Sequence, residues 1–361
     1  MAAAMTRIPW WTWVSPLLAW AILLVAKTVG DNGAVIALAA VILIATVFAA
    51  VFHAEVIAHR IGEPFGTLVL AVAVTVIEVA LIVSIMIGGG AGNAELPRDT
   101  VFAEVMVVCN GIVGLCLLAG GVRYLEQGFQ VQGASAALAV LAVLTILTLV
   151  LPNTTTSTPG PMFSTPQLIF AAIVSLVLYG SFVFVQTVRH RDYFLPVKSG
   201  RKEAHAPPPT PACALISAGL LFVALIAVVG MAKTLTPTLE LGVERLAVPK
   251  AAVGVVIAMV VLMPEGLAAF RAARANRLQI SLNLALGSAL ASIGLTIPAV
   301  AVVSIVLHQP LDLGLDLKEE VQLALTLFVG VITLGTGRTT VLQGIVHLVI
   351  FAAFLCLTIL P

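Results

Sequence analysis

The stretch "LVLAVAVTVIEVALIVSIMI", residues 68–87, decides the fold. Its twenty residues match the length that a helix needs to cross the hydrocarbon core of a bilayer. All are apolar or carry a small hydroxyl except Glu78, which stands near the middle. An ionised carboxylate at that depth costs at least a few kcal/mol, so intramembrane carboxylates usually have a function. The stretch predicts a transmembrane helix built around one functional acid.

The whole composition agrees with a membrane protein. Of the 361 residues, 60% are hydrophobic and only 10% are charged, and the mean hydropathy is +1.14. Soluble domains carry about 25% charged residues. Apart from short loops there is no basic stripe, which excludes nucleic-acid binding. The four cysteines all lie in apolar runs and indicate ordinary packing.

Eleven apolar runs predict eleven transmembrane helices. The first, Pro9–Ala26, follows Arg7 like a signal peptide, but it is long and has no cleavage site before Lys27. Trp10, Trp11 and Trp13 fit an interfacial anchor, so we expect a retained helix. The expected helices cover 10–29, 33–52, 64–88, 100–121, 133–151, 166–188, 213–231, 247–271, 280–307, 320–336 and 340–360.

Basic residues predict the orientation. With a cytoplasmic N-terminus, twelve of the eighteen Lys and Arg residues fall on the cytoplasmic side and six on the other. Because cytoplasmic loops are enriched in Lys and Arg, this favours a cytoplasmic N-terminus and an outside C-terminus. We expect the protein in the bacterial cytoplasmic (inner) membrane, in contact with lipid.

The longest polar segment divides the chain. Residues 189–212 are basic and proline-rich, which is typical of a cytoplasmic linker. With an extra N-terminal helix in 1–30, five helices remain in 33–188 and five in 213–361. An odd number reverses the direction of the second set, so the fold class predicted is an all-α polytopic membrane protein with two inverted five-helix repeats.

Two glutamates mark the repeat. Glu78 lies in the second helix of the first half, in "VTVIEVAL", and Glu265 lies in the second helix of the second half, in "VLMPEGLA". Gly66 and Gly254 precede them by twelve and eleven residues. An inverted repeat brings equivalent positions together near the bilayer midplane. Two close carboxylates repel each other, so protons and a cation should displace one another there.

A hard cation such as calcium needs six to eight oxygens, more than two glutamates supply. Pro264 frees the Val260 carbonyl for this purpose, although a simple kink is the alternative interpretation. Ser288 and Asn110 are further possible ligands on the following helices. Each is also a plausible interhelical hydrogen-bonding group.

Four stretches resemble the bacterial ChaA-type branch of the calcium/cation antiporter superfamily. They are "HRIGEPFGTLVLAVAVTVIEVALI", "VLMPEGLAAFRAARANRLQISLNLALGSALASIGLTIPAV", "QPLDLGL" and "GTGRTTVLQGIVHLVIFAAFL". The likeness runs from about His53 to the C-terminus. It implies one extra helix before two inverted five-helix halves. It also implies calcium/proton antiport, with sodium or potassium exchange in the same branch, and no cofactor.

The resemblance places the acidic residues of the two family motifs at Glu78 and Glu265, and the serine of a Gly-Ser step at Ser288. The wider family carries an asparagine at the positions of Thr75 and Leu262 and a glutamine at Ala291. The sequence therefore offers fewer side-chain oxygens than the family pattern, with Thr75 as a possible replacement ligand. The linker is basic where some members are acidic, so no regulatory calcium binding is expected there.

The segment "HAEVIAHRIGEP" has two interpretations. It holds His53, His59 and Glu63 at the expected cytoplasmic edge. The simpler interpretation is a solvated helix end. The alternative is a pH sensor or a funnel for ions, because histidine titrates near neutrality.

Two polar residues elsewhere in the chain have mainly structural interpretations. Glu104 is expected near an interface. His347, in the last helix, reads mainly as a buried hydrogen-bonded histidine rather than a proton relay.

Other function classes fit less well. No His-Glu-x-x-His or Gly-x-Ser-x-Gly motif is present, which disfavours an intramembrane enzyme. A cation channel is the other alternative, but channels favour rings of like groups in an oligomer. The predicted function is a cation/proton antiporter, with calcium first and sodium or potassium next. The sequence leaves the oligomeric state open.

Overall fold

The computed structural model describes residues 8–29, 33–62, 65–89, 94–195, 208–245 and 249–360. Within them the chain forms eleven helical rods and one two-stranded sheet. The chain divides into two compact units. Unit 1 contains Met1–Gly89 and Gly200–Ala247, and unit 2 contains Gly90–Ser199 and Val248–Pro361.

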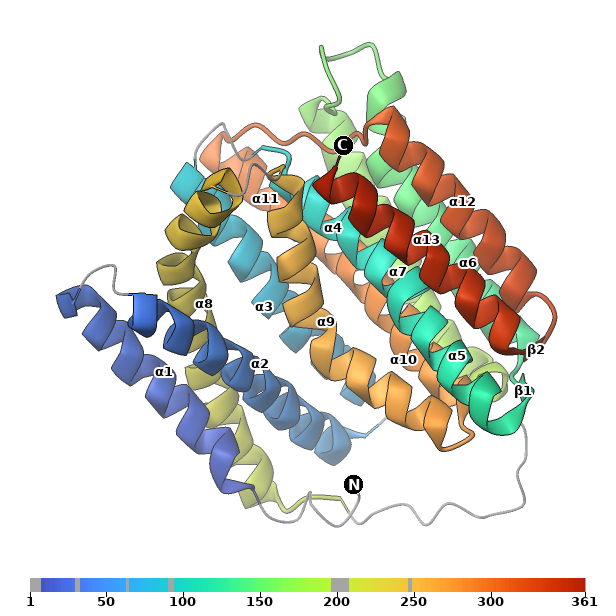
Figure 1. Cartoon of the computed structure of the whole chain (residues 1–361), viewed down its shortest axis with the longest axis horizontal. Coiled ribbons are helices and arrows are strands. Elements are labelled where there is room, and N and C mark those ends of the chain that lie inside the picture. Colours follow the sequence, from blue (N-terminus) through green and yellow to red (C-terminus); the bar gives the residue numbers. More distant parts are fainter. Residues whose placement is uncertain are drawn as a thin grey trace. The chain divides into compact units, whose positions relative to one another are not determined.

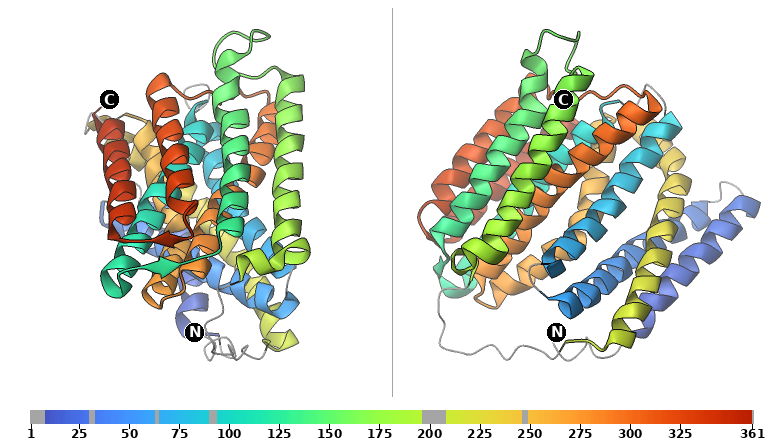
Figure 2. Two further views of the ribbon diagram at one scale, coloured as in Figure 1. Left: turned by 90° about the vertical axis from the view of Figure 1, so that its right-hand side faces the viewer. Right: turned by 180° about the vertical axis from the view of Figure 1, so that it is seen from behind.

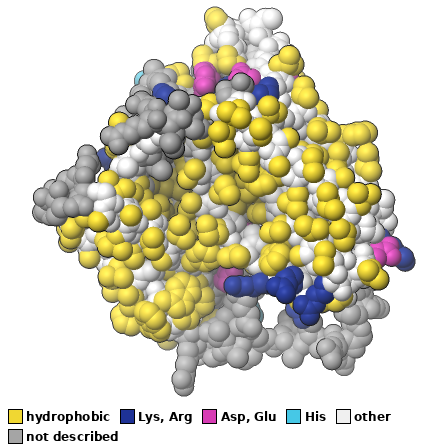
Figure 3. Space-filling model, in the orientation of Figure 1, with side chains coloured by type: hydrophobic (Ala, Val, Ile, Leu, Met, Phe, Trp, Pro, Cys, Tyr) yellow, Lys and Arg dark blue, Asp and Glu magenta, His cyan; other side chains and the backbone are white. Residues whose placement is uncertain are grey.

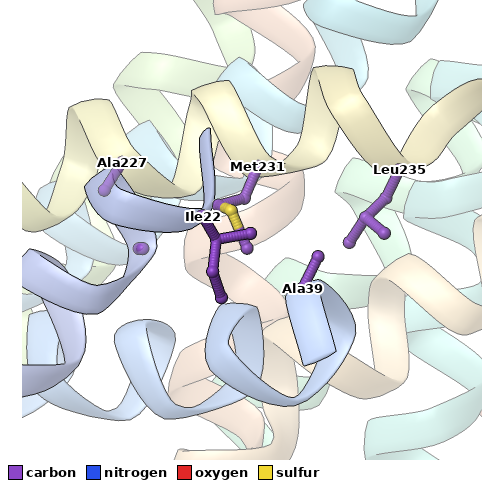
Figure 4. Packing of buried hydrophobic residues seen from close by; sticks show 6 residues of the cluster. Ile22, Ala39, Ala227, Met231 and Leu235 are labelled. Atoms are coloured by element: carbon purple, nitrogen blue, oxygen red, sulfur yellow. The ribbon is translucent and has the colours of Figure 1, made fainter. Parts of the chain in front are cut away.

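Unit 1 has four helices. They are α1 (Trp10–Val29), α2 (Gly33–Ile61), α3 (Phe65–Gly89) and α8 (Pro211–Arg245). Helix α2 packs against the other three (Figure 1). Figure 4 shows how Ile22 of α1, Ala39 of α2 and Met231 of α8 meet in its core. Small residues on α2 and α8 bring the backbones close, as is typical of membrane helix packing.

Figure 2 shows the rods of unit 2 from two further sides. Seven of the rods belong to this unit, and several of them change helix type along their length. In chain order its elements are α4 (Leu96–Met106), η3 (Val107–Ile112), α5 (Val113–Tyr124), β1 (Gln127–Gly128), α6 (Val131–Thr145), η4 (Ile146–Val150), η5 (Leu151–Thr154), α7 (Thr165–Phe184), η6 (Val185–Arg189), η7 (Arg191–Phe194), α9 (Ala251–Arg274), α10 (Leu278–Ala291), η8 (Ser292–Thr296), α11 (Ile297–Leu307), α12 (Leu317–Leu334), β2 (Arg338–Thr339) and α13 (Val341–Ile359). Strands β1 and β2 pair antiparallel, with Gln127 opposite Thr339.

Capping residues fix where several of these helices begin. Capping boxes open α7 with Ser164 and Gln167, and α13 with Thr340 and Gln343. A third opens α12 with Asp316 and Glu319. Each satisfies backbone N–H groups that have no partner inside the helix.

The structure confirms the predicted membrane architecture. Among the described residues, eight helices are long and apolar enough to cross a membrane, and two shorter apolar helices add to them. The first turn of α12 carries Lys318, Glu319 and Glu320, which accounts for its weaker apolar character. Many large hydrophobic side chains are exposed on the rods, as lipid contact requires.

Two helices are longer than the sequence suggests. Helix α2 continues through His53 and Arg60 to Ile61, and α8 continues past residue 231 to Arg245. In α8 the hydroxyls of Thr234 and Thr236 donate to the carbonyls of Gly230 and Ala232, one turn back. Polar side chains that bond within their own helix do not have to end it.

Glycines let two helices of unit 2 touch. Helix α13 runs antiparallel to α5, since Gly344 faces Leu118 whereas Gly111 faces Phe351. A methyl group added at Gly344 would lie 2.8 Å from the Leu118 Cα and 2.9 Å from the Gly114 carbonyl oxygen. The backbone on both sides leaves no room for it.

We expect Gly344→Ala to destabilise unit 2 by about 1–3 kcal/mol through overpacking. Gly287→Ala is the matched control, because nothing lies within 4 Å of a methyl group there. That change should fall within about 0.5 kcal/mol of the wild type or stabilise it slightly. Thermal melting of the detergent-solubilised chain measures both, and equal melting temperatures for the two variants would contradict the packing described.

Candidate ion-binding site

Glu78 lies at the centre of α3 in unit 1 and is completely buried, with 0% of its surface exposed. Thr75 lies one turn earlier on the same face and is also buried. Its hydroxyl has no hydrogen-bond partner among the described residues. The turn from Thr75 to Glu78 therefore offers a carboxylate and a nearby hydroxyl in an apolar helix.

Gly66 sets the position of α3 against α2. A methyl group at Gly66 would clash with the Ala58 carbonyl of α2. Gly62 ends α2 with a φ of +75°, a conformation that favours glycine. These glycines permit the close approach that positions the Glu78 helix.

Glu265 lies on α9 in unit 2 and is half-buried. Pro264 stands directly before it inside the helix. Because proline has no N–H, the Val260 carbonyl lacks its ordinary helical partner. The sequence expectation that Val260 offers a carbonyl oxygen one turn from Glu265 is therefore compatible with the observed helix.

Helix α9 runs parallel to the rod formed by α4, η3 and α5. Added methyl groups would meet Asp99 and Thr100 at Gly254, and Ile112 at Gly266. Glu265 therefore lies level with η3, which is a π-helical segment. Such segments occur frequently at functional sites in helices.

Asn110 belongs to η3, but its side-chain amide already forms hydrogen bonds with other side chains. Its Nδ2 donates to the Thr326 hydroxyl at 2.9 Å, and its Oδ1 lies 3.1 Å from Nδ1 of His347. The other ring nitrogen of His347 lies 3.1 Å from the Thr333 hydroxyl. A neutral His347 with its proton on Nδ1 satisfies all of these contacts. In this conformation the Asn110 oxygen binds α13, which gives it a structural role.

Another of the π-helical segments, η8, interrupts the matching rod of the second half. It follows α10, on which Ser288 is half-buried, one turn before the segment begins. The Thr296 hydroxyl in η8 is buried and has no partner among the described residues. The third helix of each half thus changes helix type in its middle, which hydrophobic patterning does not predict.

The two histidines of the segment "HAEVIAHRIGEP" have different environments in the structure. His53 is fully buried in unit 1, where Nε2 lies 3.2 Å from the Thr12 carbonyl and Nδ1 lies 3.2 Å from the Ser217 hydroxyl. It ties α1, α2 and α8 together, in place of the solvated helix end suggested by the sequence. His59 is half-buried near the end of α2, and Glu63 lies outside the described residues.

Glu104 is a buried acid that the sequence analysis placed near an interface. It lies within α4 in unit 2 with 0% of its surface exposed. The sequence contained evidence for the burial of Glu104, since this residue follows "TVFA" and precedes a long apolar run. Its place near the start of the helix predicted over 100–121 suggested an interface, whereas even Arg98 and Asp99, which precede that predicted helix, are buried.

Arg98 and Asp99 form a buried ion pair at the start of α4, with 5% and 6% of their surfaces exposed. Arg98 donates from Nε to Asp99 Oδ1 at 2.9 Å and from Nη1 to the Gly314 carbonyl at 3.0 Å. Nearby, partial burial and the Glu95 carboxylate raise the pKa of Asp312 in the loop before α12. The pair fastens this loop to α4.

The comparison with known families decides the identity. The model of the family described as "Sodium/calcium exchanger protein" matches residues 32–188 and 216–360. The chain belongs to the sodium/calcium exchanger family. Two curated relatives agree with this membership. The "Putative ionic transporter y4hA" of Sinorhizobium fredii is 52% identical over 98% of this chain and 97% of its own. The "Sodium-potassium/proton antiporter ChaA" of Escherichia coli is 35% identical over 88% and 87%.

Solved structures share the fold of these exchangers. Native YfkE matches with a TM-score of 0.75 and 20% identity, covering 97% of this chain and all of its own. The H⁺/Ca²⁺ exchanger CAX matches with a TM-score of 0.68 and 14% identity, covering 95% and 87%. Together with the family match, the eleven-rod membrane architecture identifies this exchanger as a multi-pass cation antiporter and not an enzyme.

Proposed function

We propose that this exchanger transports a cation across the membrane in exchange for protons, in either direction, and that Glu78 and Glu265 alternately bind the cation and the protons. Calcium is the first candidate for the cation, and sodium and potassium are the alternatives. The observation that carries the proposal is the placement of both glutamates inside apolar helices, Glu78 with none of its surface exposed. Carboxylates in such places are usually functional.

The two-fold organisation supports a shared role for the glutamates. The family model matches two stretches, and each begins within a few residues of a half predicted from the sequence. Glu78 and Glu265 each lie in the second helix of their stretch, followed by a rod with a π-helical segment, η3 or η8. Under an inverted repeat, equivalent residues of the two halves would serve one ion near the midplane.

Neutral oxygens would complete the ligand set. Thr75 and the Val260 carbonyl are the nearest candidates along α3 and α9, one turn from each glutamate. Ser288 is the further candidate on α10. Among the described residues, no three His, Cys, Asp or Glu side chains cluster as metal ligands. Calcium accepts carbonyl, hydroxyl and water oxygens beside carboxylates, so such a set suits it.

The relatives differ in the cation that their names give. The Escherichia coli relative is named for sodium-potassium/proton exchange, and a relative from Aphanothece halophytica, 26% identical over 80% of this chain, is named for Ca²⁺/H⁺ exchange. The departures at Thr75, Leu262 and Ala291 leave few amide oxygens. Competition between calcium, sodium and potassium for uptake therefore tests the cation assignment separately from proton coupling.

Protons and the cation should compete. On the acidic side of the transport optimum, the apparent KM for calcium should rise by about tenfold per pH unit for each proton that the cation displaces, because protonated carboxylates do not ligate it. Calcium uptake into proteoliposomes at several pH values measures this. A KM independent of pH would indicate a channel instead.

The histidine segment at the end of α2 has a different proposed role. His59, near the end of α2, remains the proposed pH-responsive or ion-access residue, together with Glu63, four residues later in the sequence. His59→Gln should shift the pH profile of uptake without changing the maximal rate. An unchanged profile would remove this part of the proposal.

A further inference from the structure

An apolar groove crosses unit 2 beside α9. Its volume is about 440 Å³, and it lies between α9, the η3–α5 rod and α13. Met259, Met263, Gly266 and Phe270 follow one another along one face of α9 in its wall. Gly111 and Gly266 also line the groove, where the side chains of Phe351 and Ile112 pack close to them. From Met259 to Phe270 the groove follows α9 for about 16 Å, which is about one leaflet of the hydrocarbon core.

Arginines continue the same helix faces beyond the groove. Arg271 and Arg274 stand one turn after Leu267 and Phe270 and are exposed. Arg123 is also exposed and lies on α5, eight residues after Leu115 of the groove wall. Figure 3 shows Lys and Arg side chains gathered at the lower edge of the yellow surface.

Specific contacts bring these arginines to one place. The Arg274 guanidinium lies 5.8 Å from the ring centre of Phe270, which lines the groove. The Tyr124 hydroxyl of α5 donates to the Arg274 carbonyl at 2.9 Å, and Arg123 lies over the Tyr124 ring. In the part of the chain that the structure describes, the nearby Glu126 pairs with Arg338, and Arg123, Arg271 and Arg274 form no salt bridge.

We propose that this groove binds one anionic phospholipid, with an acyl chain along α9 and the phosphate at Arg271, Arg274 and Arg123. An apolar wall that ends in unpaired cations complements a molecule with a hydrocarbon chain and a negative head. Basic pockets between membrane helices bind such head groups. In the orientation predicted from the sequence, Arg123, Arg271 and Arg274 are among the twelve basic residues on the cytoplasmic side, where anionic lipids attract cations.

Native mass spectrometry of the full chain with added lipid tests the proposal. The probes are phosphatidylglycerol and phosphatidylcholine with identical acyl chains. The wild type should prefer phosphatidylglycerol by at least about tenfold. Each arginine contributes about fivefold, so R271A/R274A should lose about 25-fold in affinity for phosphatidylglycerol and little for phosphatidylcholine.

Three variants sharpen the result. R271K/R274K keeps the charges and should keep most of the preference. Arg191→Ala is the matched control, because this exposed arginine belongs to η7, which packs against α6 and α10. Leu267→Trp fills the groove and should weaken both lipids while thermal melting shows the fold intact.

Three outcomes would overturn the proposal. Equal binding of the two lipids by the wild type would remove the charge recognition, as would full phosphatidylglycerol preference in R271A/R274A. A dimer that survives delipidation and is lost in Leu267→Trp would assign the groove to a second copy of the chain.

Discussion

Glu265→Gln and Glu78→Gln should each reduce cation/proton exchange by at least about 100-fold. Even groups that only support a metal ligand change affinity by about 10–100-fold when they are removed, and these glutamates are proposed to hold the cation directly. Glutamine keeps the shape but has neither the charge nor the exchangeable acidic proton. Calcium-dependent proton movement in everted vesicles measures the loss.

The same variants should remain folded. Replacing a buried carboxylate by its amide removes a charge that is costly to bury, so thermal melting should show no destabilisation. Glu126→Gln is the matched control, since Glu126 is exposed in the turn after α5 and should exchange at the wild-type rate. Exchange near the wild-type rate in either Glu78→Gln or Glu265→Gln would exclude that residue from the ion site.

Arg98→Ala should produce the largest loss of stability. It leaves the buried Asp99 carboxylate without its ion-pair partner and removes the bond to the Gly314 carbonyl. Breaking one side of a buried pair costs about 3–5 kcal/mol. The melting temperature of the solubilised chain should fall strongly, and R98A/D99N should recover part of the loss by removing the unpaired charge.

The residues at the two-stranded sheet include an exposed ion pair for comparison. Arg338 lies 3.7 Å from Glu126, but their side chains are 73% and 48% exposed. Exposed pairs contribute only about 0–1 kcal/mol, so Arg338→Ala should melt near the wild type. Similar melting temperatures for Arg98→Ala and Arg338→Ala would contradict the buried role assigned to Arg98.

Hydrophobic run length predicted the rods because bilayer thickness acts on the sequence directly. All eleven predicted helices have a counterpart in the described residues, and α1 has the predicted bounds, Trp10–Val29. The ends of α2 and α8 were missed because polar residues there are satisfied by burial or by their own helix. The His53 contacts to Thr12 and Ser217 show this, since they span 41 and 164 residues of sequence.

Some features of the candidate site could also be predicted from the sequence, and others could not. A carboxylate inside an apolar run is visible in sequence, and the structure confirms that Glu78 is buried. The hydrogen bonds of Asn110 to His347 and Thr326 could not be predicted from the sequence, because those partners lie more than 200 residues away. The π-helical segments also escaped prediction, since one extra residue in a turn leaves no mark on composition. Glu104 shows the opposite error, because its place near the start of the predicted helix suggested an interface, whereas it is completely buried.

Proton coupling is the central claim, and proteoliposomes loaded with a pH-sensitive dye test it most directly. Calcium is added outside while potassium and valinomycin hold the membrane potential at zero. Sodium and potassium are tried in separate runs with the potential held by other means. The account predicts that cation uptake makes the interior more alkaline, and that neither Glu78→Gln nor Glu265→Gln does so. Cation uptake by the wild type with no change of interior pH would contradict proton-coupled exchange.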